Sequence, residues 1–222
     1  MLLHSVIRSV VAPLGRAVFR PVVEGRHNVP KTGPAILAAN HLSFVDSFVI
    51  PIVAPRPVAF LAKAEYFRAP GVTGWLLRTG LSAISALPVP RGEHRAAQAA
   101  LDLALDVLSE GKAFGIHPEG SRSRDGRLYR GRTGVAWLAF ASGAPVVPVA
   151  LVGTDRMQPV GARFPRSVRI TVRFGEPLYF KTSKEAAAGP ARRAATDEIM
   201  AAIQRLSGQE TADAYNELSS GS

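Results

Sequence analysis

The sequence predicts an α/β fold in which a mixed, largely parallel sheet is flanked by helices. Short apolar runs alternate with segments of helical periodicity along most of the 222 residues, and no internal repeat interrupts them. The composition, 47% hydrophobic and 20% charged, is that of a globular domain with a full core. We therefore expect one domain over residues 21–207, between an N-terminal helix at 1–20 and a polar C-terminal tail at 208–222.

Strands are expected where short apolar runs end at turn residues. These runs cover residues 34–39, 58–62, 86–89, 113–116, 146–151 and 169–174. Helical periodicity indicates helices at 46–53, 71–78, 93–109 and 134–142, and Pro190 can open a last helix that reaches about Leu206. The helix at 93–109 is the most clearly marked, because its apolar residues form one stripe and Gly111 stands just past its end.

The two ends of the chain have distinct patterns. Residues 1–20 place their apolar side chains on one helical arc, with serine and arginine opposite. This amphipathic helix is compatible with two roles, an anchor on a membrane surface or a helix packed on the core. Arg8 breaks the apolar segment, which argues against a secretory signal, and no run is long enough to predict a membrane span. The tail from Ser219 is expected to be disordered.

The charge of the chain indicates the kind of partner, and its lack of cysteine excludes several kinds of site. The formal net charge of +10 favours an anionic partner, whether nucleic acid, anionic lipid or a phosphorylated substrate. The chain has no cysteine, which excludes a disulfide framework, a thiolate zinc site and a cysteine nucleophile. This composition fits a reducing, cytosolic setting.

The stretch "AANHLSFVDS", residues 38–47, places His41 and Asp46 five positions apart where a buried strand ends. On a helix this spacing separates the side chains by roughly 140°, and on a strand it puts them on opposite faces. A tight turn would instead let the carboxylate reach Nδ1 of the imidazole, which would leave Nε2 free as a base. The alternative is a helix start capped by Ser43, in which His41 is an ordinary loop histidine.

A second polar stretch, residues 113–134, has five arginines within eleven residues against the single acid Asp125. They follow the strand that leads into Pro118-Glu119-Gly120, and they are Arg122, Arg124, Arg127, Arg130 and Arg132. Guanidinium groups bind phosphate oxygens, and a glycine after a strand lets a backbone N–H approach an anion. The stretch is typical of a phosphate or oxyanion cradle. It lacks the Lys-Ser/Thr of a nucleotide loop, and Tyr129 is its one interleaved aromatic, so no nucleic-acid partner is expected.

The sequence offers no covalent nucleophile. It has no Gly-x-Ser-x-Gly elbow and no cysteine, so a base would have to act on a hydroxyl of the substrate. A metal site built from His41, Asp46, His117 and Glu119 matches no ligand spacing. We expect neither a metal nor a bound cofactor.

Residues 40–46, Asn-His-Leu-Ser-Phe-Val-Asp, resemble the NHx4D block of the glycerolipid acyltransferases, and more narrowly of the 1-acylglycerol-3-phosphate acyltransferase family. Three further blocks follow in the order of that family, "ALPVPR" at 86–91, "IHPEGSR" at 116–122 and "VVPVAL" at 146–151. The similarity covers about residues 20–180. The chain departs from the family pattern at His117, which replaces an aromatic or aliphatic residue, and at Pro88 and Pro90.

The resemblance implies an enzyme that moves a fatty acyl chain from an acyl thioester to the free hydroxyl of 1-acylglycerol 3-phosphate, giving phosphatidic acid. Acyl-CoA or acyl-ACP would serve as co-substrate. His41, oriented by Asp46, would act as general base without an acyl-enzyme, and a backbone N–H near Gly120 would stabilise the oxyanion. Two alternatives stay open: a different acceptor, such as glycerol 3-phosphate, a lyso-ornithine lipid or a glycolipid, and a catalytically silent protein that binds anionic lipid.

The resemblance also implies the residues that bind substrate. Arg91 and Arg122 would hold the acceptor phosphate, and Glu119 would shape the acceptor pocket. Lys63 would add positive charge there, although it also fits an exposed lysine at a strand end. The remaining expected substrate-binding residues are Asn40, Ser43 and Ser121. His117 is expected to line the pocket rather than act as a second base.

Lipid substrates imply a place in the cell. We expect a peripheral protein on the cytoplasmic face of the cell membrane, drawn to an anionic surface by basic residues worth about 1 kcal/mol each and by the apolar face of residues 1–20.

Overall fold

The computed structural model describes residues 21–63, 86–89, 93–159, 166–181 and 188–216, with the single positions 70, 71, 74, 75, 79 and 162. The N-terminal helix predicted at 1–20, most of the helix predicted at 71–78 and the tail from Ser219 lie outside the described residues. Within the described part of the chain, no helix has the length and apolar character needed to cross a bilayer.

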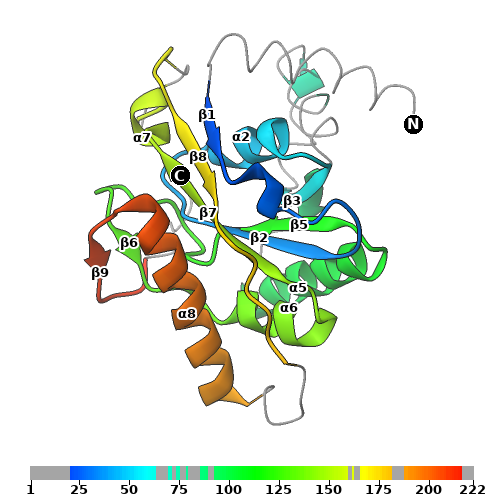
Figure 1. The fold of residues 1–222 in the computed structure, drawn as a ribbon. Helices are drawn as coiled ribbons and strands as arrows, with labels where there is room; N and C mark the ends of the chain where they lie inside the picture. Colours follow the sequence, from blue (N-terminus) through cyan, green and yellow to red (C-terminus); the bar gives the residue numbers. More distant parts are fainter. Residues whose placement is uncertain are drawn as a thin grey trace.

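The centre of the molecule is a seven-stranded sheet with the order β1-β8-β7-β2-β5-β3-β4 (Figure 1). Its strands are β1 (Val22–Glu24), β2 (Ala35–Ala39), β3 (Val58–Lys63), β4 (Ala86–Val89), β5 (Ala113–Ile116), β7 (Val146–Val152) and β8 (Thr171–Phe174). Neighbouring strands run parallel except β7 and β8, which are antiparallel. This arrangement confirms the predicted mixed, largely parallel sheet.

Helices cover both faces of the sheet. The larger layer contains α5 (Glu93–Ser109), α6 (Gly134–Ser142) and α8 (Gly189–Ser207), and the other face carries α2 (Asp46–Val53) and the single-turn η1 (Arg26–Asn28) (Figure 1). A short helix, α7 (Thr154–Met157), follows β7. Three of the predicted helices, at 46–53, 93–109 and 134–142, have the bounds expected from the sequence.

Strand β2 lies between the two cores, and all five of its side chains are fully buried. Leu37 packs with Ile50 of α2 and Val149 of β7 in one core, whereas Ile36 packs with Leu138 of α6 in the other. A parallel strand covered on both faces has this continuous apolar character. Because each fully buried leucine or isoleucine contributes about 1.5–3 kcal/mol, the carboxyl end of β2 is held firmly.

A small second sheet joins two distant parts of the chain. Strand β6 (Leu128–Tyr129) pairs in parallel with β9 (Thr211–Ala212). The residues around β9, 208–216, form a C-terminal strap along the arginine loop, residues 118–132. The amide of Leu128 donates to the Glu210 carbonyl at 2.8 Å, and the amide of Arg130 donates to the Ala214 carbonyl at 2.9 Å. The sequence predicted only a polar tail here.

Candidate active site

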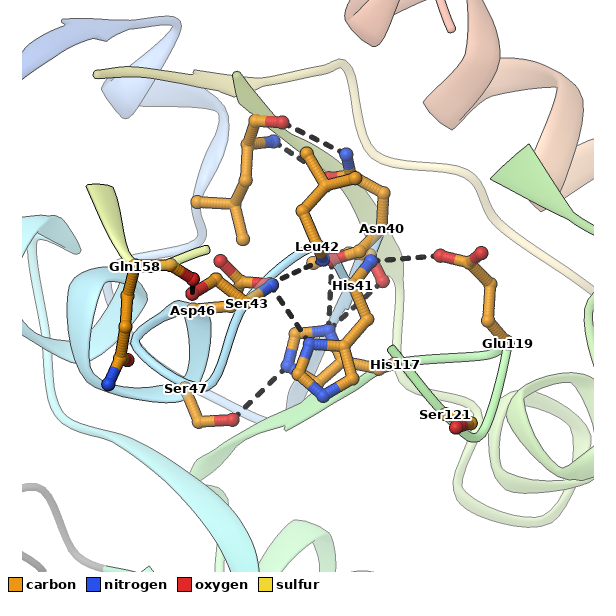
Figure 2. A network of polar contacts seen from close by, with 12 residues as sticks. Asn40, His41, Leu42, Ser43, Asp46, Ser47, His117, Glu119, Ser121 and Gln158 are labelled. Carbon is orange, nitrogen blue, oxygen red and sulfur yellow. Dashed lines mark hydrogen bonds and ion pairs between the residues drawn. The ribbon is translucent and has the colours of Figure 1, made fainter. Parts of the chain in front are cut away.

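The predicted polar residues gather at the carboxyl edge of the central strands. Strand β2 ends at Ala39, and its parallel neighbour β5 leads into the arginine loop, so the turn carrying His41 and the loop carrying Glu119 lie side by side (Figure 2). Ligand sites in parallel α/β sheets form at this edge. The arrangement therefore supports the predicted position of the site.

A turn after β2 brings His41 and Asp46 together. The Nδ1 atom of His41 lies 2.9 Å from Oδ2 of Asp46, which is fully buried at the start of α2. The same oxygen accepts the backbone N–H groups of Leu42 and Ser43, both at 2.7 Å. A carboxylate on Nδ1 places the histidine proton there and leaves Nε2 with a lone pair.

The alternative interpretation, in which Ser43 caps the helix, is wrong. Val45 precedes α2, and no side chain in the described part of the chain forms a cap hydrogen bond at that helix end. The Ser43 hydroxyl instead donates to the carbonyl of Gln158 at 3.0 Å. The side chain of Ser43 therefore ties the His41 turn to the residue that follows α7.

The backbone of His41 is held on both sides by the arginine loop. Its N–H donates to Oε1 of Glu119 at 2.8 Å, and its carbonyl accepts the N–H of Ser123 at 2.7 Å. The side chain is 17% exposed, so most of it is enclosed and part of it reaches solvent. A base that must meet a substrate hydroxyl needs such access.

The buried side chain of Glu119 links the turn after β2 to strand β6. Its second oxygen, Oε2, accepts the N–H of Tyr129 in β6 at 3.0 Å, while Oε1 accepts that of His41. The residue is fully buried. Burial raises the pKa of the carboxyl to about 7, and the two N–H donors oppose this rise only in part.

The loop after β5 opens with a turn that engages the amide of Gly120. This N–H donates to the carbonyl of His117 at 3.0 Å, and Gly120 itself adopts φ +77°, where glycine is favoured. The amide of Gly120 is therefore not free to stabilise an oxyanion, which corrects the expectation for this residue. Within the described part of the chain, the next amide, that of Ser121, has no acceptor.

His117 stacks on His41, a relationship that the sequence did not indicate. The ring centroids are 3.9 Å apart and the planes differ by 8° (Figure 2). Nδ1 of His117 contacts the carbonyls of Ala39 and Asn40 at 3.2 and 3.0 Å, and the Ser47 hydroxyl lies 3.3 Å from its Nε2. Burial, reinforced by His41, lowers the pKa of His117 to about 3, so the ring is neutral.

Asn40 is buried and fully engaged with the protein. Its Oδ1 accepts the N–H of Leu151 at 2.8 Å, and its Nδ2 donates to the Leu151 carbonyl at 2.9 Å. The side chain thus continues the hydrogen bonding of β7 beyond the end of β2. Nδ2 also donates to Oε1 of Gln209 in the C-terminal strap at 2.7 Å, a contact across 169 positions that no local pattern reveals.

The five arginines of the loop divide into three groups. Arg127 forms an ion pair with Asp125 at 2.7 Å, which lowers the pKa of that carboxyl to about 2. The guanidinium groups of Arg130 and Arg132 lie 5.4 and 5.8 Å from the ring centroid of Tyr215 in the strap. The remaining two, Arg122 and Arg124, are exposed, and their guanidinium groups have no partner among the described residues.

Two predicted site residues lack described side chains. Arg91 lies outside the described residues, and Lys63 ends β3 with its side chain outside them. Among the side chains that are described, no group of three or more histidine, aspartate or glutamate residues has the arrangement of a metal site.

The chain is similar in sequence to known proteins. The acyltransferase family profile matches residues 20–152, more than half of the chain. The chloroplastic 1-acyl-sn-glycerol-3-phosphate acyltransferase LPAT1 of Arabidopsis thaliana is 31% identical over 141 residues, covering 63% of this chain and 38% of the relative. The 1-acyl-sn-glycerol-3-phosphate acyltransferase of Borreliella burgdorferi is 32% identical over 134 residues, covering 60% and 52%. The chain thus spans about half the length of these relatives or less.

A solved structure is also similar. The crystal structure of the 1-acyl-sn-glycerophosphate acyltransferase PlsC from Thermotoga maritima superposes with a TM-score of 0.70 at 28% identity, covering 91% of this chain and 80% of that one. The family profile, the relatives and the shared fold lead to one conclusion: this chain belongs to the acyltransferase family.

Proposed function

We propose that the chain transfers a fatty acyl group from an acyl thioester to the free hydroxyl of 1-acylglycerol 3-phosphate, which yields phosphatidic acid. The observation that carries this proposal is the 2.9 Å contact between Nδ1 of His41 and Oδ2 of Asp46 at a partly open site. The activity named for the relatives from Arabidopsis thaliana and Borreliella burgdorferi supports the same acceptor.

In this mechanism His41 is the general base and Asp46 orients it. Nε2 takes the proton of the acceptor hydroxyl as its oxygen attacks the carbonyl carbon of the thioester. The tetrahedral intermediate then collapses with breakage of the carbon–sulfur bond, and the imidazolium returns the proton to the leaving thiolate. The products are an ester and a free thiol, and no acyl-enzyme forms. General-base assistance of this kind is worth roughly 10²- to 10⁴-fold in rate.

The developing oxyanion needs a hydrogen-bond donor close to His41. The amide of Ser121 is our candidate, because it follows the Glu119-Gly120 turn and has no acceptor among the described residues. One such donor contributes roughly 10²- to 10³-fold in rate. We propose that Arg122, which is exposed and next in the chain, holds the acceptor phosphate, and that Arg91 and Lys63 contribute to that contact.

Three residues that were expected to bind substrate are better explained as residues that hold the structure of the site. Asn40, Ser43 and Glu119 are buried, and their contacts are to backbone groups and to Gln209. We propose that Glu119 shapes the acceptor site by holding the arginine loop against His41, without touching the substrate itself.

The lipid acceptor supports a peripheral position on an anionic membrane, on its cytoplasmic face. Residues 1–20 are the proposed contact, and either acyl-CoA or acyl-ACP is the proposed donor. We propose that the exposed guanidinium groups of Arg122 and Arg124 add positive charge to the loop beside the site.

The deciding experiment measures release of free thiol from palmitoyl-CoA with and without lysophosphatidic acid. We expect acceptor-dependent release by the wild type and its loss in His41→Ala, with both proteins folded by circular dichroism. Release that requires glycerol 3-phosphate or a glycolipid instead would replace the proposed acceptor. No release with any acceptor, tested with acyl-CoA and acyl-ACP, would favour a silent protein that binds anionic lipid.

A further inference from the structure

The ring of His41 needs more than its contact with Asp46 to be held in one orientation. A single hydrogen bond at Nδ1 fixes one atom, and the last side-chain torsion of histidine is intrinsically broad. The ring can therefore tilt about the Nδ1–Oδ2 contact, which would move Nε2 away from its substrate. A second constraint must act on the face of the ring.

The structure places such a constraint at His117. Its ring lies parallel to that of His41, with the ring centroids 3.9 Å apart, and it is itself held by two parts of the fold. The carbonyls of Ala39 and Asn40 accept from Nδ1 at the end of β2, and Ser47 of α2 contacts Nε2. Because Pro118 has no amide hydrogen, the side chain of His117 supplies a donor where β5 cannot continue its ladder.

Strand β3 contributes a further aromatic ring. Phe60 lies 5.6 Å from His117, tilted by 35°. Gly115 on β5 makes room for it, because a Cβ at that position would lie 2.0 Å from Cζ of Phe60. A residue with any side chain at 115 would displace the ring that packs beside His117. The support under His41 thus extends into the sheet.

We propose that His117 is a positioning residue whose ring holds the ring of His41 in the plane from which Nδ1 reaches Asp46. This inference rests on the proposed function, because it assigns His117 to the same reaction. His117 can hold the ring of His41 even when His41 becomes a positively charged imidazolium, because His117 itself stays neutral. Among the described residues, the titratable groups that face it are His41 and Asp46, and burial with His41 lowers its pKa to about 3. A neutral ring does not repel the imidazolium that forms on His41.

Two variants separate the ring from its hydrogen bonds. His117→Phe keeps a flat ring for stacking but removes the donor to the Ala39 and Asn40 carbonyls. His117→Asn keeps an N–H donor near the position of Nδ1 but removes the ring. The first should therefore preserve the orientation of His41 at a cost in stability, and the second should do the reverse.

Steady-state kinetics and thermal unfolding test this separation. We expect His117→Asn to lower kcat roughly 10-fold or more, since a small misplacement of a reacting group is costly, and to leave both KM values within about 2-fold. His117→Phe should keep kcat within about 3-fold of the wild type yet unfold at a lower temperature than His117→Asn. A purely structural role would make activity and stability fall together.

The opposite results would overturn the inference. If His117→Asn kept full activity while His117→Phe lost it, His117 would serve only to satisfy the two carbonyls. Equal kcat in all three proteins, or equal losses in both variants, would also show that the ring does not position His41.

Nitrogen NMR of the five histidines gives a readout that needs no acceptor. We expect the His41 side chain to stay protonated at Nδ1 in all three proteins, and its ring signals to broaden through tilting of the ring in His117→Asn alone. The His117 ring should stay neutral from pH 8 to pH 5 in the wild type. If the wild type transferred no acyl group, the proposed function would fail, while the His41 ring signals would still decide whether His117 holds that ring. Equally sharp His41 ring signals in all three proteins would reject the inference.

Discussion

Asp46 contacts His41 through only one of its two carboxylate oxygens. Oδ2 accepts three hydrogen bonds, from Nδ1 of His41 and from the amides of Leu42 and Ser43. Oδ1 is buried and has no hydrogen-bond partner among the described residues. The geometry of the turn therefore depends on one acceptor atom, whereas the negative charge belongs to the whole group.

This asymmetry makes Asp46→Asn a test of charge alone. The new amide can place its oxygen at the site of Oδ2, keep all three hydrogen bonds and direct its NH₂ group to the site of Oδ1. We expect a folded protein whose kcat falls roughly 10²-fold, because the imidazolium loses its counter-charge. Steady-state rates of thiol release check the expected loss.

Asp46→Ala is the control for geometry. It removes the shared acceptor and leaves the amides of Leu42 and Ser43 without their partner, at about 1–3 kcal/mol for each buried donor. Denaturant unfolding should separate the two variants, with only the alanine variant strongly destabilised. Wild-type kcat in Asp46→Asn would show that the charge plays no part in the reaction.

Arg122 and Arg127 offer a matched pair for the acceptor phosphate. Both are exposed arginines of the same loop, but Arg127 is paired with Asp125 and Arg122 has no polar partner among the described residues. A hydrogen bond to a charged group is worth about 1.5–3 kcal/mol, so Arg122→Ala should raise the KM for lysophosphatidic acid roughly 10- to 100-fold. Arg127→Ala should change it by less than about 3-fold. Equal effects would mean that the loop acts only through its overall charge.

Glu119 makes the stability of the protein depend on pH. Its pKa is raised from 4.5 to about 7, so between these values the folded chain keeps a proton that the unfolded chain has released. The resulting stabilisation is complete below pH 4.5 and is lost as pH rises through 7. The free energy of unfolding should therefore fall in this window relative to that of Glu119→Gln, by on the order of 3 kcal/mol.

Urea unfolding of the two proteins at pH 4.5, 6 and 8 measures this difference. The comparison cancels the opposite trend from His117, whose lowered pKa removes stability as pH falls from 6.5 towards 3. A constant difference between the proteins would show that Glu119 does not titrate in this range.

The proposed membrane contact can be tested by removing residues 1–20. A variant that begins at Pro21 keeps β1 and all the described elements, so we expect it to fold. It should lose most of its co-sedimentation with phosphatidylglycerol vesicles, because we expect the apolar face of the helix predicted at residues 1–20 to supply much of the binding energy. Equal binding by both proteins would assign the contact to another surface.

The sequence predicted the elements whose residues carry their own signal. The α5 helix was evident from one apolar stripe followed by Gly111, and β2 from a continuous apolar run. Strands β1, β6 and β9 were missed because strands of two or three residues have too few positions to show a pattern. Their hydrogen bonds come from segments far away in the chain.

The same distinction applies to the site. His41 and Asp46 were predicted together because a local turn joins them, and the structure brings them to 2.9 Å. The stacking of His117 and the bond from Asn40 to Gln209 depend on how β2, β5 and the strap meet in space. The sequence showed that His117, before Pro-Glu-Gly, departs from the family pattern, but it did not show that His117 stacks on His41.

The C-terminal strap determines which parts of the chain can be exchanged between relatives. The family profile ends at residue 152, yet Gln209 bonds to both Asn40 and Gly126, and Asn216 donates to the carbonyl of Ser121 at 3.2 Å. A chimera that carries residues 20–152 alone would lose the hydrogen bonds that Gln209 and Asn216 make to this segment. We therefore expect the smallest unit that can be exchanged between relatives with its hydrogen bonds intact to run through residue 216.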